Sequence, residues 1–151
     1  MRVTVRIEDE ALLKDLKSLS KAAQGAALGE ALMVGAEAVG GFARNNIQAH
    51  DLIDTSALVN SIETRLAKAS GSKAEAEIGT NIVYAAIHEF GGVIKATAAK
   101  ALHFVIDGVH VVTKSVTIPA RPYLRPALDE HETEIGEVIG KELAKNIRRA
   151  L

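Results

Sequence analysis

The sequence predicts an α+β fold in which a small, mainly antiparallel sheet of hairpins packs against long helices, the last of them C-terminal. Two observations support this class. Runs with a period of two occur in pairs joined by short turns, as in antiparallel hairpins. Runs with helical spacing are interspersed among these pairs, and the links between elements have hairpin length. The chain has 151 residues, so we expect a single domain over residues 1–151 with a substantial core.

Composition excludes several classes of function. Hydrophobic residues make up 48% of the chain but aromatic residues only 3%, so we expect a core of small aliphatic side chains. The net charge of -1 argues against a general nucleic-acid binder, because neutralising phosphates needs an excess of Lys and Arg. The chain contains no cysteine, which excludes disulfides and thiol catalysis. Charged residues throughout "MRVTVRIEDE" exclude a signal peptide.

The N-terminal part, residues 1–24, is expected to form a strand followed by a helix. Val3, Val5 and Ile7 alternate with polar residues, which predicts a half-buried strand. Four leucines within residues 10–20 then follow helical spacing, which predicts the helix.

A longer helix is expected over residues 25–48. Glu30 and Glu37 lie away from its apolar stripe and argue against a membrane span. The stripe consists of Leu28, Leu32, Gly35, Val39 and Phe42. Four glycines each lower helix propensity by about 1 kcal/mol relative to alanine. They are Gly29, Gly35, Gly40 and Gly41. We therefore expect a close-packed neighbour, either a sheet or another subunit.

The next region is expected to hold a loop with a short helical turn, followed by a hairpin. The candidate N-caps of the turn are Asp54, Thr55 and Ser56. Residues 62–66 and 74–78 both alternate between apolar and polar side chains, and "KASGS" lies between them. This arrangement predicts two antiparallel strands.

A short helix and a second hairpin follow. "VYAAIHEFGG", residues 83–92, predicts a helix that ends at the two glycines. "ALHFVI" and "VHVVTKSVTI" flank Asp107-Gly108, a dipeptide suited to the positive φ angles of a type I′ turn. The segment 93–118 is therefore expected to project as a hairpin.

The C-terminal helix is placed by its proline and its charges. A proline is tolerated only where the helical N–H has no partner, so Pro126 must lie within the first four positions. The helix therefore begins no earlier than about Tyr123. Acidic residues come early and basic residues late, as the helix macrodipole favours. The apolar stripe is Leu128, Ile135, Ile139, Leu143 and Ile147.

The search for catalytic or metal-binding motifs finds no complete site. His88-Glu89 begins a His-Glu-x-x-His zinc motif, but Gly92 stands where the second histidine belongs. His103 and His110 flank the Asp107-Gly108 turn and are expected to face each other across the hairpin. Two histidines alone fall short of the three or four ligands of a strong metal site. No serine-nucleophile motif or phosphate-binding loop is present. We therefore expect no cofactor and no tightly bound metal.

Two segments are candidates for an interface or a structural role. In the helix before the two glycines, we expect Tyr84, Ile87 and Phe90 to form the buried face, and Glu89 to project elsewhere. "IPARPYLRPAL", residues 118–128, contains three prolines that stiffen it. It is either a rigid elbow that orients the last helix or a docking strap.

In this stiff segment we expect Arg121, Tyr123 and Arg125 to point outward. If the segment folds back over the end of the helix, Arg121 and Glu89 are placed to form an ion pair. The candidate interface or structural residues are Tyr84, His88, Glu89, Phe90, Arg121, Tyr123 and Arg125.

A family resemblance rests on four motifs in a fixed order. They are "TSALVNSI" at 55–62, "IGTNIVYAAIHEFGG" at 78–92, "KALHF" at 100–104 and "IPARPYLRPAL" at 118–128. Together they resemble the tail-completion, or head–tail joining, proteins of tailed double-stranded DNA bacteriophages and prophages, including those labelled virion morphogenesis proteins. The resemblance covers roughly residues 25 to 150.

The resemblance implies a structural protein that is not an enzyme. It implies a ring of copies of this chain at the neck or head-proximal end of the tail, next to connector and tail-terminator or tail-tube proteins. DNA would pass through this ring without sequence-specific binding, and no membrane is involved. The protein would lie in the host cytoplasm during assembly and afterwards in the virion.

Two other functions remain open at this point. One is a hydrolase that uses His88 and Glu89. The other is a DNA-binding accessory protein that uses the basic C-terminal "KNIRRAL".

Overall fold

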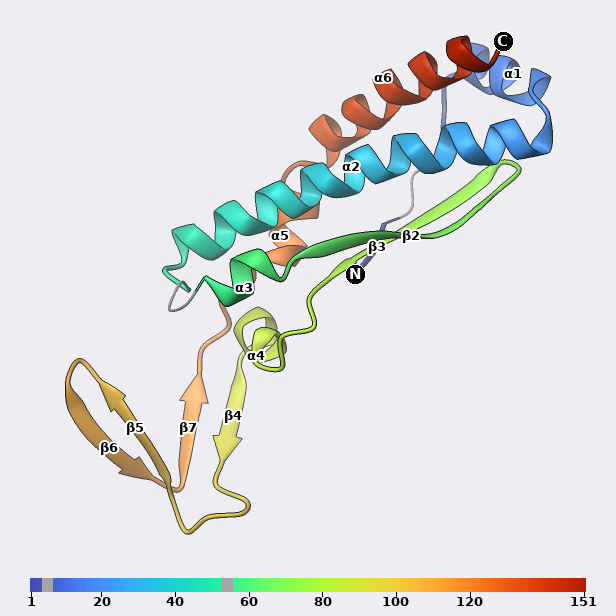
Figure 1. Ribbon diagram of the computed structural model, residues 1–151. Coiled ribbons are helices and arrows are strands. Elements are labelled where there is room, and N and C mark those ends of the chain that lie inside the picture. The colour runs from blue at the N-terminus through green and yellow to red at the C-terminus, as the bar shows by residue number, and fades with distance from the viewer. Residues whose placement is uncertain (4–6, 53–55) are drawn as a thin grey trace. The chain divides into compact units, whose positions relative to one another are not determined.

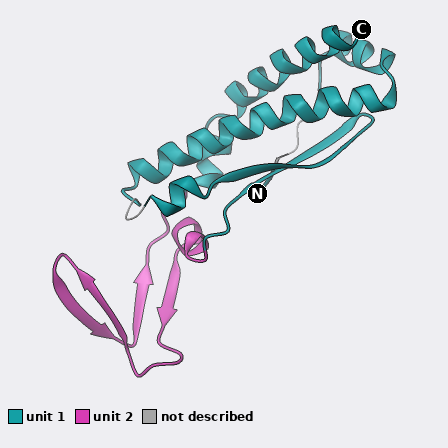
Figure 2. Cartoon of the chain, viewed as in Figure 1, with its two compact units in different colours: residues 1–82, 123–151 teal, residues 83–122 magenta. Residues whose placement is uncertain are grey.

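The structure, a computed structural model, describes residues 1–3, 7–52 and 56–151. It divides into two compact units (Figure 2). Residues 1–82 and 123–151 form the helical unit, and residues 83–122 form the inserted unit. The α+β class and the antiparallel pairing are confirmed. The single-domain expectation stays a prediction, and each unit is described by itself.

Two capped helices begin the helical unit. α1 spans Glu10–Ser18 and α2 spans Lys21–Ala49. The side chains of Asp9 and Ser20 accept hydrogen bonds from backbone N–H groups of the first turn, as N-cap residues do. α2 begins earlier than the apolar stripe predicted, because the cap at Ser20 sets where the helix starts.

α2 is the central helix of the helical unit (Figure 1). It packs against α6, which spans Glu132–Ala150, on one side and against the hairpin β2–β3 on the other. By length and composition α2 is apolar enough to cross a membrane, but half of its most apolar window is buried in the unit. The core helix of a globular protein has the same properties.

The glycines of α2 allow close approach on both sides. A Cβ placed on Gly35 would lie 2.3 Å from Cγ1 of Ile139 in α6. A Cβ on Gly29 would lie 3.0 Å from Cδ2 of Leu66 in the hairpin. The predicted close-packed neighbour is confirmed at these two positions, and it is both a helix and a sheet of the same chain. At Gly41, by contrast, a Cβ would meet nothing within 4 Å.

The first hairpin is confirmed. β2 spans Glu63–Ser70 and β3 spans Lys73–Gly79, and they pair antiparallel around Gly71. β1, Arg2–Val3, pairs with the other edge of β3, so the strand order is β1-β3-β2. The rest of the predicted first strand falls partly on residues 4–6, which lie outside the described residues.

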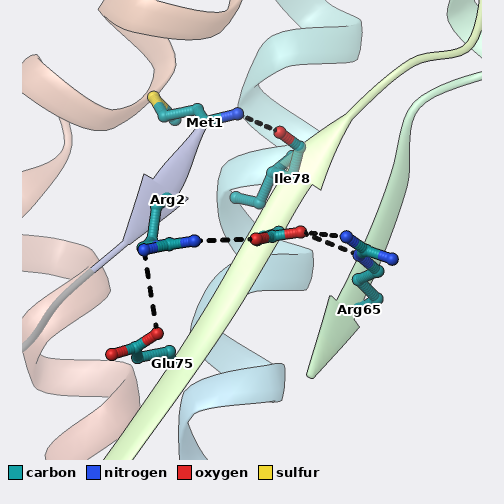
Figure 3. Close-up of polar contacts among 6 residues, drawn as sticks. Met1, Arg2, Arg65, Glu75 and Ile78 are labelled. Carbon is teal, nitrogen blue, oxygen red and sulfur yellow. Dashed lines mark hydrogen bonds and ion pairs between the residues drawn. The ribbon is translucent and has the colours of Figure 1, made fainter. Parts of the chain in front are cut away.

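Charged side chains cross this three-stranded sheet (Figure 3). Glu77 of β3 accepts hydrogen bonds from Nη2 of Arg2 at 3.2 Å and from Nε of Arg65 at 2.8 Å. The bond from Arg65, and then that from Arg2, lowers the pKa of Glu77. The N-terminal amine of Met1 donates to the carbonyl of Ile78 at 2.6 Å. Both arginines are exposed, so these pairs align the strands at a small gain in stability.

A short helix precedes β2. α3 spans Ala57–Asn60, and Ser56 occupies its N-cap position with φ +59° but no side-chain capping bond. The other two predicted caps, Asp54 and Thr55, lie outside the described residues.

The predicted long C-terminal helix is confirmed as α6, but the prediction that one helix runs from near Tyr123 to the end is wrong. Two helices are present, α5 at Leu124–Asp129 and α6. His131 leaves helical geometry with φ −118°, and its ring stacks on Phe42 of α2 with a centroid distance of 3.5 Å. The predicted earliest start, near Tyr123, is confirmed.

The inserted unit contains one short helix and two separate two-stranded sheets. α4 spans Ala85–Phe90. β4 at Gly92–Lys95 pairs with β7 at Ser115–Ile118, and β5 at Leu102–Ile106 pairs with β6 at Val109–Thr113. The prediction of one strand over residues 109–118 is therefore wrong. The segment forms two strands, and the second of them, β7, pairs with β4.

The tip of the second hairpin is as predicted. Asp107 and Gly108 have φ angles of +50° and +78°, so both central residues have the positive φ of a type I′ turn.

Candidate functional site: the exposed apolar surface of residues 83–122

Exposed hydrophobic side chains gather in the inserted unit. Of the thirteen large ones that the described chain exposes, nine lie in this unit, although it is the smaller of the two. The nine are Val83, Tyr84, Phe90, Val93, Ile94, Val105, Ile106, Val109 and Val112. Single exposed hydrophobic residues are ordinary, whereas contiguous ones mark protein contacts, so the unit that holds most of these residues is the candidate contact surface.

The end of α4 is fixed by a turn that requires glycine. Gly91 has φ +69° and ψ 178°, a region that essentially only glycine adopts. A Cβ on Gly91 would lie 2.7 Å from the backbone nitrogen of Ala120. The N–H of Arg121 donates to the carbonyl of His88 at 2.7 Å. The segment after β7 therefore folds back onto α4, as the ion-pair hypothesis required.

The predicted buried face of α4 is wrong. Tyr84 and Phe90 are 45% and 77% exposed, whereas Ala85 and Glu89 are buried. Positions four apart lie on one helix face, so Ala85 and Glu89 share the side that packs inward. Ile87, the third member of the predicted face, is only half-buried.

Glu89 and Arg121 do not form the predicted ion pair. Glu89 is buried and does not project from the surface as predicted. The ion pairs among the described residues include none between these two side chains. The charge of Arg121 acts instead on His88.

His88 occupies a site that disfavours its charged form. Its Nδ1 is buried without a hydrogen-bond partner in the described structure, and the ring of Tyr84 meets it edge-on at 5.8 Å. Burial, and then the positive charge of Arg121, lowers the pKa of His88 below its usual 6.5. A neutral imidazole fits a packing role beneath Tyr84.

Acidification is expected to destabilise α4 through His88. Because the pKa of His88 is lower in the folded state, the unfolded state takes up the proton first as the pH falls below 6.5. The contribution of His88 to stability is full above pH 6.5 and is lost as the pH falls through the folded-state pKa. The free energy of local opening of α4 checks this. It is obtained from amide hydrogen exchange, corrected for the intrinsic pH dependence of exchange, at about pH 7.5 and pH 5.

The matched variants are His88→Gln and His103→Gln, the latter at an exposed histidine. In His88→Gln the opening free energy of α4 is expected to depend less on pH than in the wild type. In His103→Gln it is expected to depend on pH as in the wild type. An equal slope in the wild type and His88→Gln would contradict the expectation.

The β5–β6 hairpin has one fully exposed face and one face that is half-buried except at the pair next to the turn. The register places His103 opposite Val112 and Val105 opposite His110. These four side chains share a face, and all are exposed. We call them the Val/His face. The valines were not among the candidates from sequence, although a run of β-branched residues in a short hairpin was a usable signal.

The two hairpin histidines do not face each other as predicted. His103 and His110 lie on the same face but are diagonal neighbours, because each has a valine directly opposite. Within the described residues, no three His, Cys, Asp or Glu side chains are grouped to hold a metal ion. The expectation of no metal or cofactor stays a prediction.

The stiff segment is divided between the two units. Arg121 is exposed in the inserted unit, whereas Tyr123 and Arg125 belong to the helical unit. Tyr123 is 2% exposed, so the prediction that it points outward is wrong. Its carbonyl accepts a hydrogen bond from Nδ2 of Asn46 at 3.0 Å, which ties it to α2. Arg125 is exposed, and its Nε lies 3.7 Å from Oδ2 of Asp129 in an ion pair.

A hollow of about 610 Å³ lies beside β3 in the helical unit. Arg2, Arg65 and Glu77 line it, and their charges pair with one another. The pairs of Arg2 and Arg65 with Glu77 account for three of the charges that line the hollow, as on an ordinary sheet surface.

The residues of the inserted unit described above lie within one family match. Residues 13–144 match the phage virion morphogenesis family. The chain belongs to this family. The match includes the whole inserted unit and most of the helical unit, so the resemblance inferred from the four motifs is confirmed. No curated protein and no solved structure matches the chain significantly.

Membership gives the virion morphogenesis protein a structural role in phage assembly. The basic C-terminus, on which the DNA-binding alternative rested, is largely paired. Lys145 lies 3.0 Å from Glu142, and Arg149 donates to Glu30 of α2. These contacts favour charge matching within the helical unit over a basic surface for phosphates.

Proposed function

We propose that this virion morphogenesis protein is a non-enzymatic tail-completion, or head–tail joining, subunit. It forms a ring with copies of itself at the neck or head-proximal end of the tail. The observation that carries the proposal is the exposed apolar surface of the inserted unit, in a member of a phage assembly family. A surface of this kind suits protein contacts made during assembly.

The distribution of charge supports contact between copies. The inserted unit has four Lys and Arg residues against two acidic ones, Glu89 and Asp107. The rest of the chain has fourteen Lys and Arg against seventeen Asp and Glu. The two units therefore carry opposite net charge, so whole copies placed side by side attract each other through their different units as well as through any direct contact. Contacts between different faces of successive copies are heterologous, and they generate rings when the rotation closes.

The proposed partners follow from the location. One face of the ring meets neck or connector proteins, and the other meets tail-terminator or tail-tube proteins. DNA passes through without sequence-specific contacts, as the slightly negative net charge allows. The protein is made in the host cytoplasm and ends in the virion, and no membrane takes part. The isolated chain is monomeric or weakly associated, and subunits already on the tail raise the effective concentration.

Complementation tests the proposal. Particles made without this gene are expected to accumulate as separate heads and tails, and adding the purified protein restores joining. Phe90→Ala removes an exposed aromatic side chain of the inserted unit and is expected to lower the joining activity by about tenfold or more. The matched control is Leu151→Ala in the helical unit, where the side chain is 73% exposed against 77% for Phe90.

Two outcomes would contradict the proposal. One is normal joining of particles that lack the gene. The other is a failure that begins earlier, with no capsid shell formed.

A further inference from the structure

The β5–β6 hairpin has two open strand edges. Among the described strands, β5 and β6 pair only with each other. Each therefore presents one edge of unpaired backbone N–H and C=O groups. An isolated two-stranded sheet is marginally stable, and an open edge is a template for another strand.

The three-stranded sheet of the helical unit has β2 at one edge, and β2 shows how this chain protects an edge. Glu63, Arg65 and Lys68 place charges along β2, and the register shifts between Leu66 and Lys68. Charges and bulges are the usual means of blocking edge-to-edge pairing. β5 and β6 have neither device, because the strands "LHFVI" and "VHVVT" contain no Lys, Arg, Asp or Glu and pair in unbroken register.

We propose that these unprotected edges pair with the same hairpin of neighbouring copies, so that β6 of one subunit lies beside β5 of the next. This inference rests on the proposed ring and names the contact that builds it. A second copy fits because both strands have five residues and because pairing them brings no like charges together.

The directions of the strands favour a head-to-tail arrangement. β5 and β6 are antiparallel within a hairpin. In hairpins arranged side by side in the same orientation, β6 is also antiparallel to the next β5. Each subunit then uses one edge of each kind, which is the heterologous contact that a ring needs. Pairing β6 with β6 would instead close a dimer and leave both β5 edges open.

The residues that supply this contact follow from the register. Ile106 and Val109 flank the two-residue turn as the closing pair. The closing pair is hydrogen-bonded, and non-hydrogen-bonded pairs alternate with hydrogen-bonded ones from there. The non-hydrogen-bonded pairs are His103–Val112 and Val105–His110, and their backbone N–H and C=O groups point outward from the hairpin. These are the residues of the Val/His face. Pairing of edges therefore joins the exposed faces of successive hairpins.

Cysteine cross-linking tests the arrangement, because the natural chain has no cysteine. Four single variants of the full-length chain are made: His103→Cys and Val105→Cys on β5, and His110→Cys and Val112→Cys on β6. Each β5 variant is mixed with each β6 variant, used to complement gene-deficient particles, and oxidised. Disulfide-linked dimers are expected in at least one mixture and in no variant alone. Dimers formed by a single variant, or none in all four mixtures on joined particles, would overturn the inference.

Lysine on an edge gives an independent test. Val105→Lys and Val112→Lys each place on the hairpin the charge that protects natural edges, and each is expected to reduce joining by about tenfold or more. The control is Val34→Lys, at an exposed valine of α2. If the edge variants join particles as well as the wild type while gene-deficient particles stay unjoined, the inference fails but the proposed function stands. If gene-deficient particles join normally, the proposed function fails instead.

Discussion

Replacing Gly35 with alanine is expected to lower the free energy of unfolding by about 1–3 kcal/mol. The added Cβ would lie 2.3 Å and 2.4 Å from two carbons of Ile139, so α2 and α6 cannot keep their separation unless that side chain moves. Ile139 is only 5% exposed and has little room to do so. Alanine also raises helix propensity by about 1 kcal/mol, so the measured loss is the balance of the two effects.

The matched control is Gly41→Ala in the same helix. No atom lies within 4 Å of a Cβ at Gly41, so only the gain in propensity remains, and stability is expected to rise by up to about 1 kcal/mol. Urea unfolding of both variants measures the difference. Equal stabilisation by both substitutions would show that α6 does not pack on α2 at Gly35.

Replacing Gly91 with alanine is expected to disrupt the inserted unit. Its backbone conformation costs a non-glycine residue about 1–3 kcal/mol. The added Cβ would also meet the backbone of Ala120 at 2.7 Å, and a backbone cannot rotate away as a side chain can. The expected result is loss of the hydrogen bond from Arg121 to His88. Faster exchange of the Arg121 amide hydrogen, together with reduced particle joining, would report this.

The control for Gly91 is Gly71→Ala. Gly71 also has a positive φ, +55°, but a Cβ there would meet nothing within 4 Å. Only the backbone cost of about 1–2 kcal/mol for a left-handed residue is expected there. Slow exchange at Arg121 in Gly91→Ala, as in Gly71→Ala, would show that the turn at Gly91 does not hold the segment after β7.

Features encoded by neighbouring residues could be predicted from the sequence. The Asp107-Gly108 turn, the hairpin of β2 and β3, and the end of α4 at Gly91 each depend on a few adjacent residues with distinctive φ preferences. The α+β class followed from these elements. The glycines of α2 also indicated a close neighbour, because their cost in helix propensity requires compensation.

Features that depend on distant partners could not be predicted. β7 pairs with β4, which lies before the hairpin of β5 and β6, and local periodicity carries no information about that choice. The break before α6 places His131 on Phe42, a contact between segments far apart in sequence. Helical charge order continues through this break, so the pattern resembled one helix.

The exposure of the candidate residues was predicted in part, and their role in contacts stays a prediction. Phe90, Arg121 and Arg125 are exposed, as a contact role requires, although Phe90 was expected to be buried. Glu89 and Tyr123 are buried, because each lies on an inward-packing side that residue type alone does not reveal. Arginine and tyrosine are common contact residues, but tyrosine is as often a core residue when its polar end finds a partner.

The packing of α6 on α2 also sets an order of events during synthesis. Asn146 of α6 donates to the carbonyl of Ala27 in α2, and 119 positions separate the two residues. At about 5–20 residues per second, a ribosome takes roughly 6–24 s to make that intervening stretch. During this interval the nascent α2, the longest helix of the chain, gains β2 and β3 to cover one side once they are made, but it has no α6 to cover the other. Host chaperones that bind apolar helices therefore have their best opportunity before the last twenty or so codons are translated.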